Sequence, residues 1–447
     1  MTVAEKSFLR QGEAGYASAI SGFKINFTQE PQVVFAARET RDLVDAVRYA
    51  RAHKLPLSVL STGHGQIRAN NGGVLVNVSA LNGVRIDPVA RTARVEAGAT
   101  WGAVQGAARE HGLAGLAGDS ASVGVAGFTL GGGMGWLGRK YGLACDSLLE
   151  VELVMADGQL RKVNAGNDPE LFWALRGGGG GFGVVAALTF RLYPVPRVLA
   201  GQVVFPLEGA AEALRFYRRW VTTLPDEMTT TAALLRGPDI EAMPPFVRGR
   251  TALLVRFVHS GDPDAGADLL APLRKLPGVI AEQVVETVPS ELAALLGPPP
   301  GPMVAFGRGE QFDALSDEAI DALVAYAGQD NPAPRIVELR HLGGAIARQC
   351  YEASAYSQRD AVFLLNANAL APVPQLVEAA KAFAYGIKDV VRPFVTGRVA
   401  PNFLQGDEGA ERDAAAYQGG NHARLQAVKR RVDPDNLFAF ARTPGSR

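Results

Sequence analysis

Cysteine is scarce in this chain, and the scarcity argues against two kinds of stabilising site. Only Cys145 and Cys350 occur among 447 residues, with no CxxC pair and no cysteine–histidine cluster at ligand spacing. A disulfide framework needs several cysteines, and structural zinc needs four ligands at short spacings. We therefore expect neither a disulfide nor a metal site, and we interpret both cysteines as buried free thiols.

An excess of one charge sign and long apolar runs are lacking as well. The 45 basic and 45 acidic residues cancel, whereas proteins that bind nucleic acids or anionic membranes usually carry a basic excess. No run approaches the length of a membrane-spanning helix, and the start, MTVAEKSFLRQGE, has no apolar signal region. These absences predict a soluble, cytoplasmic protein without nucleic-acid or membrane partners. The many Ala, Gly, Arg and Val residues favour a bacterial source with a high GC content.

Glycine, by contrast, is dense in three stretches of the N-terminal half. They are 60–66 (LSTGHGQ), 118–135 (GDSASVGVAGFTLGGGMG) and 176–185 (RGGGGGFGVV). Glycine lacks a Cβ atom, so such loops bring backbone N–H groups close to a ligand, and successive N–H groups in a concavity bind phosphate. Three such loops, each entered from an apolar strand-like run, predict a large phosphate-bearing cofactor.

Hydrophobic spacing predicts short alternating elements up to about residue 195. We expect strands at 31–37, 57–60, 74–78, 84–86, 92–97 and 184–192, and helices at 43–53, 101–111 and 169–175. Thr40 is the expected N-cap of the first helix. The first hundred residues are interpreted as a small α/β unit. The Asp-Gly pair at 157–158, between apolar runs 148–155 and 160–163, predicts a hairpin.

The pattern changes near residue 200, and the chain is long enough for two or three domains. Strand candidates at 202–205, 251–258, 279–286, 335–342 and 361–367 are widely spaced between helices such as 208–224 and 265–273. This spacing favours an antiparallel sheet covered by helices, an α+β substrate domain. We interpret 297–303 as a rigid surface loop and expect 403–438 to be largely helical.

Several motifs together resemble one family. Ser61-Thr-Gly-His-Gly, the run Val123–Gly135, Ala156-Asp-Gly, Trp173–Gly183 and Asp433-Pro-Asp-Asn-Leu-Phe occur in the order found in FAD-linked oxidases of the berberine-bridge-enzyme type, within the vanillyl-alcohol-oxidase superfamily. The resemblance covers residues of about 30–195 and 396–440. It implies a bipartite, PCMH-type FAD-binding domain (1–198), an antiparallel-sheet substrate domain covered by helices (199–395), and a C-terminal segment (396–447) that completes the FAD domain.

The resemblance also implies which residues bind the cofactor. His64 matches the family's histidine that is bonded to the 8α-methyl group of the flavin, whereas a histidine satisfied within a turn would be the default for an isolated residue. Ser120 stands where many relatives have a second, cysteinyl linkage, so we predict FAD that is monocovalently attached through His64. The other implied FAD-binding residues are Ser61, Thr62, Gly63, Gly65, Gly118, Asp119, Ser120, Val123, Gly124, Gly127, Phe128, Gly131, Gly132, Gly133, Tyr141, Gly142, Gly183, Val185 and Asn402.

A nicotinamide-binding Rossmann fold is the main alternative for the glycine loops. It requires G-x-G-x-x-G directly after its first strand, at the start of a helix, with an acidic residue about 20 positions later. The first loop here offers only Gly63-His-Gly without that spacing. The spacing therefore argues against a Rossmann fold.

Val123 bears on the electron acceptor. By resemblance it matches a position that governs the access of oxygen to the reduced flavin, where valine accompanies oxidases and isoleucine accompanies dehydrogenases. Simple packing of an apolar residue explains Val123 equally well. We predict an oxidase that takes two electrons from a small alcohol, amine or secondary-metabolite intermediate and reduces O2 to hydrogen peroxide.

The base that would assist such an oxidation is missing from the family's usual positions. Those positions read Gln66, Leu365 and Ala400 here. Candidates for a catalytic role are Tyr351, His341, Gln66 and Asn366, and Tyr356, Glu338 and Arg359 could also face the flavin ring. For Glu338, Arg340 and Arg359 we prefer a solvated or ion-paired strand edge. A substrate that needs little base assistance, such as an acidic phenol, is the remaining option.

Other functions are open at this point. A dehydrogenase with another acceptor would differ only in oxygen reactivity. A flavin-bearing protein without oxidase activity would explain the missing bases. A hydrolase without flavin is disfavoured, because no G-x-S-x-G motif or metal cluster occurs.

Overall fold

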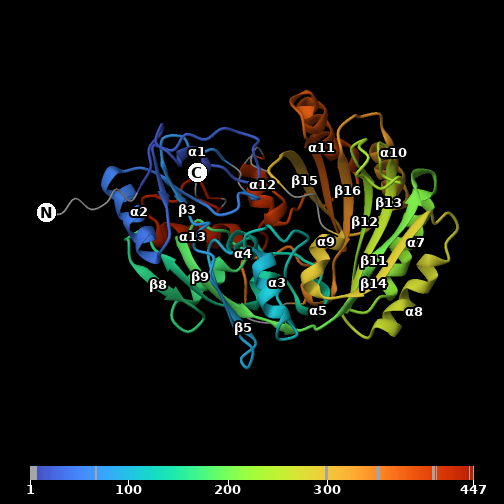
Figure 1. The fold of residues 1–447 in the computed structure, drawn as a ribbon, viewed down its shortest axis with the longest axis horizontal. Helices are drawn as coiled ribbons and strands as arrows, with labels where there is room; N and C mark the ends of the chain where they lie inside the picture. The colour runs from blue at the N-terminus through green and yellow to red at the C-terminus, as the bar shows by residue number, and fades with distance from the viewer. Residues whose placement is uncertain are drawn as a thin grey trace.

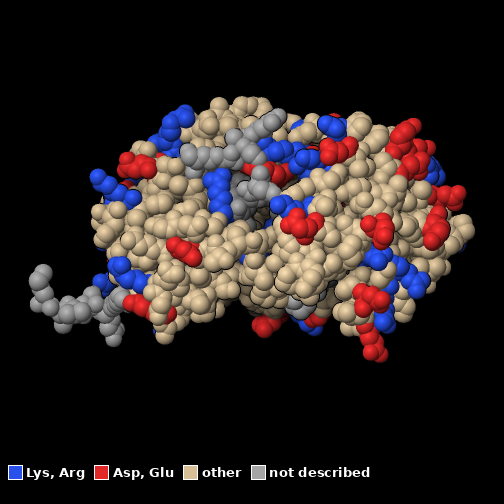
Figure 2. Space-filling model, turned by 90° about the horizontal axis from the view of Figure 1, so that it is seen from above, with Lys and Arg blue, Asp and Glu red and all other residues tan. Residues whose placement is uncertain are grey.

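Two lobes lie side by side in the structure, a computed structural model that describes residues 8–65, 68–296, 301–348, 353–404, 408, 410–441 and 443–445. The first lobe contains the beginning and the end of the chain, and the second contains its middle (Figure 1). On the face drawn in Figure 2, Lys and Arg side chains are interspersed with Asp and Glu, and no large area carries a single sign.

Two sheets build the first lobe. A parallel sheet has the order β1-β3-β2, from β1 (Val33–Ala36), β2 (Leu57–Leu60) and β3 (Val74–Asn77). An antiparallel sheet has the order β4-β5-β9-β7-β8, from β4 (Val84–Asp87), β5 (Thr92–Glu96), β7 (Leu148–Val154), β8 (Leu160–Val163) and β9 (Val184–Arg191). A short ladder joins β6 (Leu113–Ala114) and β10 (Tyr193–Pro194).

This arrangement confirms the hairpin and corrects the α/β unit. Strands β7 and β8 pair antiparallel around the Asp157-Gly turn, as predicted. The first hundred residues, however, are divided between the two sheets, because β4 and β5 join β9 rather than β1–β3. The first helix begins at Thr40, but Glu39 is its N-cap, and Asp42 accepts from the backbone N–H groups of Arg38 and Glu39 at 2.7 and 3.1 Å. The expected cap at Thr40 is therefore wrong by one residue.

The helices follow the same division into lobes. Those of the first lobe are α1 (Tyr16–Ala19), α2 (Thr40–His53), α3 (Trp101–Arg109), α4 (Val125–Leu130), α5 (Gly138–Tyr141), α6 (Pro169–Leu175), α12 (Ala410–Ala415) and α13 (Asn421–Val432). Those of the second are α7 (Ala210–Trp220), α8 (Pro263–Arg274), α9 (Leu292–Leu296), α10 (Asp317–Gly328) and α11 (Val377–Val391). Short 3-10 turns are η1 (Ala144–Ser147), η2 (Leu207–Gly209), η3 (Val221–Thr223), η4 (Pro289–Glu291), η5 (Gly344–Ile346), η6 (Pro374–Leu376) and η7 (Pro401–Phe403).

A seven-stranded antiparallel sheet forms the second lobe. Its order is β14-β11-β13-β12-β16-β17-β15, from β11 (Val198–Pro206), β12 (Met228–Arg236), β13 (Thr251–His259), β14 (Ala281–Thr287), β15 (Val304–Phe312), β16 (Arg335–His341) and β17 (Phe363–Ala371). Helices α7, α8, α10 and α11 cover the face that is turned away from the first lobe (Figure 1). The antiparallel sheet under helices is thus confirmed, whereas β12 and β15 were not among the expected strands. The predicted boundaries at 198 and 395 stay a prediction.

Because side chains alternate along these strands, apolar residues lie on one face of the sheet and polar residues on the other. Val337, Leu339 and Leu365 lie in the apolar core under the helices. In the antiparallel register Glu338 is opposite Asn366, so these two share the other face, which looks toward the first lobe. Polar groups on central strands therefore point between the lobes.

The C-terminal segment is tied to the first lobe by a buried ion pair. Lys429 on α13 and Asp433 are 1% and 2% exposed, and Lys429 Nζ donates to Asp433 Oδ2 at 2.5 Å and to the carbonyl of Gly181 at 2.8 Å. Asp433 also accepts from the N–H groups of Leu437 and Phe438 at 2.8 and 3.0 Å. This pair thus links the Asp433–Phe438 turn to the third glycine stretch.

Asp433→Asn is expected to destabilise the protein by about 3–5 kcal/mol, because it leaves the Lys429 ammonium group buried without its counter-charge. The free energy of unfolding from a urea titration measures this. Asp435→Asn is the matched control, since Asp435 is exposed and an exposed substitution usually changes stability by no more than about 0.5 kcal/mol. Equal stability of the two variants would contradict the role given to the pair.

Candidate functional site

The three glycine stretches, far apart in sequence, contact one another in the first lobe. The first stretch follows β2, and the Thr62 hydroxyl accepts from the backbone N–H of Gly124 in the second at 3.2 Å. The N–H of Gly179, in the third stretch, donates to the carbonyl of Leu130 at the end of α4 at 2.9 Å. Helix α4 and its flanking loops therefore lie between the other two stretches.

Some of these glycines are required by close backbone contacts, and others border open space. Gly63 has φ +76°, and a Cβ atom there would lie 2.6 Å from the Cα of Gly22. A Cβ atom on Gly124 would lie 3.1 Å from Ser61 Oγ. At Gly65 and Gly127 it would meet nothing within 4 Å. The loops are thus tightly joined to each other while two of their glycines face free volume.

His64 stands where the first and second stretches meet. Its ring stacks on Phe23 at a centroid distance of 3.8 Å, with 14° between the planes. Nδ1 lies 3.1 Å from Thr62 Oγ1 and Nε2 lies 3.2 Å from Ser122 Oγ. Burial, helped by the nearby charge of Lys24, lowers the pKa of His64 to about 4. The imidazole is therefore neutral at pH 7, and one ring nitrogen keeps a lone pair that can form a bond.

Residues of the C-terminal segment and of the second lobe both contact the second glycine stretch. Asn402, in η7, donates through Nδ2 to the carbonyl of Phe128 at 3.0 Å, and its side-chain oxygen occupies the space that a Cβ atom on Gly131 would need. Tyr356 is buried, and its ring lies 2.7 Å from the Cβ position of Gly132, whose φ is +117°. Burial raises the pKa of Tyr356, so its phenol stays protonated.

Other predicted cofactor residues are placed as follows. Gly118 faces the ring of Phe128, Gly133 faces Phe128 and Ala144, Ser120 Oγ lies 3.0 Å from Ser122 Oγ, and the carbonyl of Val123 accepts from the N–H of Trp101 at 2.9 Å. Tyr141 stacks on Tyr193 at 4.2 Å, Gly142 faces Asp146, Gly183 faces Leu153, and Val185 lies within β9. Tyr141, Gly142, Gly183 and Val185 therefore contribute to the packing of the first lobe, and these contacts do not involve His64.

The catalytic candidates are only partly brought together. Gln66 and Tyr351 lie outside the described residues. Asn366, on β17, faces the first lobe, and its Oδ1 accepts from Asn368 Nδ2 at 2.8 Å. Leu365 lies in the core beneath the helices, so that position offers no polar group to the site.

His341 ends β16 and is 8% exposed. Its Nε2 lies 3.1 Å from Arg139 Nη1, and Arg139 also donates through Nε to the carbonyl of Met228 at 2.9 Å. Burial, and then the charge of Arg139, lower the pKa of His341 to about 3. Because a guanidinium only donates, Nε2 must accept, and the single proton of the neutral ring therefore sits on Nδ1.

A buried charge cluster joins the lobes. Arg340 on β16 donates from Nη2 to Asp119 of the second glycine stretch, and from Nε to Glu338 Oε2 at 2.8 Å. Burial alone would lower the pKa of Arg340, but Asp119 and Glu338 raise it. Two carboxylates thus share one guanidinium, and the cluster joins the second glycine stretch to β16.

The expected ion pairing of Glu338, Arg340 and Arg359 is confirmed, whereas their expected place at a solvated strand edge is wrong. Strand β16 lies between β12 and β17 in the middle of the sheet, and Glu338 is 2% exposed. Arg359 is also buried in an ion pair, although it lies in a loop: its Nη2 donates to Asp146 Oδ1 at 2.6 Å. The sequence signal was available: the alternation in Val337-Glu-Leu-Arg puts both charged residues on one face of a buried strand.

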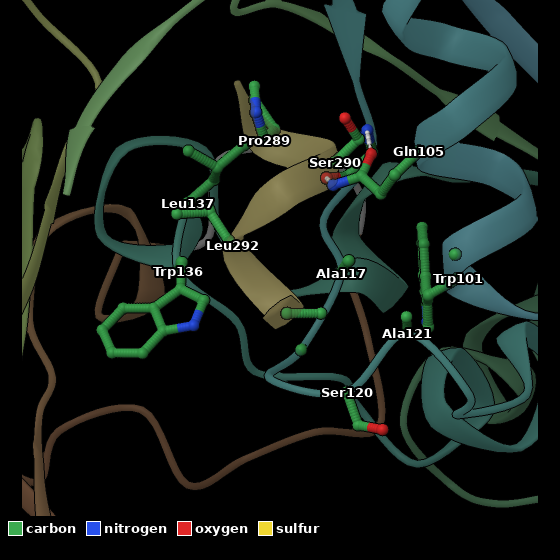
Figure 3. A pocket seen from close by; sticks show the side chains of 14 residues that line it. Trp101, Gln105, Ala117, Ser120, Ala121, Trp136, Leu137, Pro289, Ser290 and Leu292 are labelled. Carbon is green, nitrogen blue, oxygen red and sulfur yellow. Dashed lines mark hydrogen bonds between the residues drawn. The ribbon is translucent and has the colours of Figure 1, made fainter. Parts of the chain in front are cut away.

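Two small cavities lie along the junction between the lobes. The first, of about 20 Å3, is bounded by the second glycine stretch, by Trp101 and Trp136, and by Ser290 and Leu292 of the second lobe (Figure 3). The second, of about 10 Å3, lies between residues 134–136 and the strands β12 and β16. Each is about large enough for a water molecule. Trp136 borders both.

The described residues contain neither a metal-binding cluster nor a membrane-spanning helix. No three His, Cys, Asp or Glu side chains are placed so that they could share a metal ion. No helix in this part of the chain combines the length and hydropathy needed to span a bilayer.

Comparison with known proteins identifies similar chains. A family described as FAD binding domain matches residues 31–164, and one described as berberine and berberine like matches residues 401–442. The chain is 28% identical over 442 residues to the FAD-linked oxidoreductase YgaK of Bacillus subtilis, covering 95% of this chain and 93% of that protein. These matches confirm the resemblance drawn from the motifs.

Solved structures share the fold. The 6-hydroxy-D-nicotine oxidase of Arthrobacter nicotinovorans superposes with a TM-score of 0.87 at 24% identity, covering 99% of this chain and 98% of that one. Phl p 4, a grass pollen allergen with glucose dehydrogenase activity, gives 0.84 at 21% identity and covers 98% and 96%. A variant of Phl p 4 in which one isoleucine is replaced by valine is described as a glucose oxidase. The PCMH-type fold is thereby confirmed.

The residues at the meeting point of the loops fit FAD. Ser61 Oγ and Thr129 Oγ1 are buried without a partner among the described residues, and Gly65 and Gly127 border free volume. Backbone N–H groups of the first and second stretches would hold the phosphates, since such loops bind anions. His64 would lie beside the flavin.

His341→Gln tests the neutral, buried state of this histidine. In the unfolded chain its pKa is about 6.5, so the unfolded state takes up a proton between pH 6.5 and about 3 that the folded state does not. The wild type should therefore lose about 2 kcal/mol of unfolding free energy through this residue between pH 7 and pH 5. Glutamine still accepts from Arg139 but does not titrate.

Urea titrations at pH 7 and pH 5 give the measurement. The variant should lose less stability than the wild type on acidification. His111→Gln is the control, since His111 is exposed, and it should follow the wild type. If His341→Gln and the wild type respond equally to pH, then folding does not lower the pKa of His341.

Proposed function

We propose that this chain, a member of the berberine-bridge-enzyme-like FAD-linked oxidoreductases, is an FAD-dependent oxidase. In this proposal it takes two electrons from a small alcohol, amine or secondary-metabolite intermediate and reduces O2 to hydrogen peroxide. The observation that carries it is His64, neutral and held by two hydroxyl groups where two glycine stretches meet. A cytoplasmic location stays a prediction.

His64 is proposed to bind the flavin covalently. Stacking on Phe23 and the contacts with Thr62 and Ser122 fix the plane of the ring, and the lowered pKa leaves a nitrogen lone pair available. The FAD, when bound, supplies the two-electron chemistry, and the protein tunes and orients it. Cys145 is fully buried, and burial raises the pKa of its thiol, which disfavours a second linkage there.

The residues of the second lobe would position the substrate. Asn366, Glu338 and Arg340 face the first lobe from adjacent strands. The low pKa of His341 makes it a weak proton acceptor at neutral pH, because an efficient general base has a pKa near the operating pH. Glu338 is already bonded to Arg340. The proposal therefore favours a substrate that releases its proton easily over one that needs a strong base.

The choice of O2 as acceptor rests on Val123. Its side chain packs, half-buried, against the first lobe's core, and the isoleucine-to-valine variant of Phl p 4 described as a glucose oxidase supports a role for a small residue in oxygen reactivity. A dehydrogenase with another acceptor is the second candidate, supported by the glucose dehydrogenase activity of Phl p 4 itself.

His64→Ala is expected to abolish covalent flavin attachment. After acid precipitation, the wild type should retain flavin in the pellet and show a fluorescent band on a denaturing gel, and the variant should show neither. His111→Ala is the control and should behave as the wild type. Flavin in the supernatant of the wild type would contradict a covalent bond. The absence of flavin from folded protein supplied with FAD would overturn the proposed function.

Val123→Ile is expected to slow the reaction of the reduced flavin with O2 by tenfold or more, while reduction by substrate is unchanged. Stopped-flow reoxidation and dye-linked turnover measure the two half-reactions separately. Val125→Ile, in the buried core of α4, controls for simple overpacking. If reoxidation of wild type is already as slow as that of the variant, the chain is a dehydrogenase.

A further inference from the structure

The segment 22–26, between α1 and β1, lies against the first glycine stretch. The N–H of Phe23 donates to the carbonyl of Thr62 at 2.8 Å. The Cα of Gly22 lies only 2.6 Å from the position that a Cβ atom on Gly63 would take. The segment and the glycine stretch are therefore joined backbone to backbone, with no room for a side chain between them at Gly63.

The same segment also pairs with the second lobe. The N–H of Met303 donates to the carbonyl of Phe23 at 2.8 Å, and the N–H of Ile25 donates to the carbonyl of Met303 at 3.2 Å. The side chain of Asn26 exchanges two hydrogen bonds with the backbone of Ala305, at 2.8 and 3.2 Å. Ala305 belongs to β15, the last strand of the seven-stranded sheet (Figure 1). The segment therefore lies along the outer edge of that strand.

Phe23 is thus held by both lobes. Its N–H bonds to the first lobe and its carbonyl bonds to the second, so a shift of β15 relative to the first glycine stretch would move the Phe23 backbone. The ring of Phe23 stacks on the ring of His64, with 3.8 Å between the centroids and 14° between the planes. The surroundings of His64 therefore depend on how the second lobe is placed.

Stacking restricts the His64 ring in a way that its hydrogen bonds do not. The hydroxyls of Thr62 and Ser122 lie beside Nδ1 and Nε2, and a hydroxyl hydrogen rotates to suit its partner. These two bonds therefore tolerate some tilt of the imidazole plane. The parallel ring of Phe23 does not, because at 3.8 Å the two rings are in van der Waals contact and a tilt would make them collide.

We propose that Phe23 is a positioning residue, which fixes the plane of the His64 ring and links that plane to the position of β15 in the second lobe. The lone pair of an imidazole nitrogen lies in the ring plane, so the plane decides the direction from which a bond to that nitrogen can form. Reaction between held groups depends strongly on such alignment. The inference rests on the proposed function, since it concerns the histidine proposed to bind FAD.

Three variants and a control separate the ring from the backbone. Phe23→Leu removes the aromatic ring, Phe23→Tyr keeps it, and Asn26→Ala removes the two bonds to β15 while the Phe23 ring remains. Phe8→Leu is the matched control, since Phe8 is also half-buried and aromatic but packs on Phe35 and Tyr49. Phe23→Met takes the place of Phe23→Leu if that variant does not fold, because methionine fills irregular apolar gaps.

The first measurement is the NMR spectrum of the FAD-free full chain with isotope-labelled histidine, in which His64→Ala identifies the His64 signals. A stacked aromatic ring moves the ring-proton signals of its neighbour upfield. The upfield position should be present in the wild type, in Phe23→Tyr and in Phe8→Leu. It should be lost in Phe23→Leu, and Asn26→Ala should move the signals part of the way.

The second measurement is the rate of covalent attachment after FAD is added, read as the flavin that stays with acid-precipitated protein. It is made in air, since forming the nitrogen–carbon bond removes one hydrogen from the imidazole and one from the 8α-methyl group, and O2 takes up both as hydrogen peroxide. At saturating FAD, Phe23→Leu should slow attachment by about tenfold or more. Asn26→Ala should slow it by a smaller factor, and Phe23→Tyr should restore the wild-type rate. A variant that merely bound FAD more weakly would keep the wild-type rate at saturation.

Two results would overturn the role of Phe23: His64 signals that are the same in Phe23→Leu and the wild type, and attachment rates that are equal in the two. If Asn26→Ala matches the wild type in both measurements, the link to the second lobe is wrong. The NMR measurement uses no FAD, so it fails separately from the proposed function. A wild type that attaches no flavin would contradict the covalent bond, while the spectra would still decide whether Phe23 positions the His64 ring.

Discussion

The close contact of glycine backbones around His64 is the constraint on which the rest of the first lobe depends. Gly63 approaches the backbone of Gly22 so closely that no side chain fits, and Gly124 packs tightly against the side chains of Ser61 and Thr62. Only this approach lets the Thr62 hydroxyl reach both the N–H of Gly124 and the ring of His64. The same hydroxyl thus orients the histidine and joins the loops, so the position of the His64 ring is set by packing.

The second lobe is held to this centre by charges that face each other across the junction. Arg340 bonds to Asp119 over 221 positions of sequence, and Arg139 crosses in the opposite direction to reach Met228 and His341. Arg139 of the first lobe is bonded to groups of the second lobe, and Arg340 of the second lobe bonds to Asp119 of the first as well as to Glu338 on its own strand. These contacts, together with the Arg359–Asp146 and Lys140–Glu227 pairs, help to fix the orientation of the lobes and keep the polar face of the sheet opposite the glycine stretches. The buried Lys429–Asp433 pair performs a similar task for the C-terminal segment.

Local patterns predicted part of this arrangement and could not predict the rest. The glycine stretches, the β7–β8 hairpin and the helix-covered sheet follow from composition and periodicity, which are properties of neighbouring residues. Strand β12 was missed because Met228–Arg236 does not alternate between apolar and polar residues, and β15 because Gly307 and Gly309 weaken its pattern. Gly309 is small because Phe403 packs against it, a contact between distant segments. The contact of Arg340 with Asp119 depends on the docking of the lobes, so Arg340 was wrongly interpreted as a strand-edge residue.

The residues that stand at the family's base positions limit how the proposed reaction could be assisted. The oxidase proposed above would have to lower the energy of the substrate as it loses a proton and a hydride, either by accepting the proton or by stabilising the oxygen that carried it. Leu365 and Ala400 offer no acceptor for the proton. His341 is a poor acceptor as well, because burial and Arg139 lower its pKa to about 3 and the guanidinium already donates to its Nε2. In the proposed oxidase, stabilisation of the oxygen by fixed donors would therefore have to replace acceptance of the proton by a side chain.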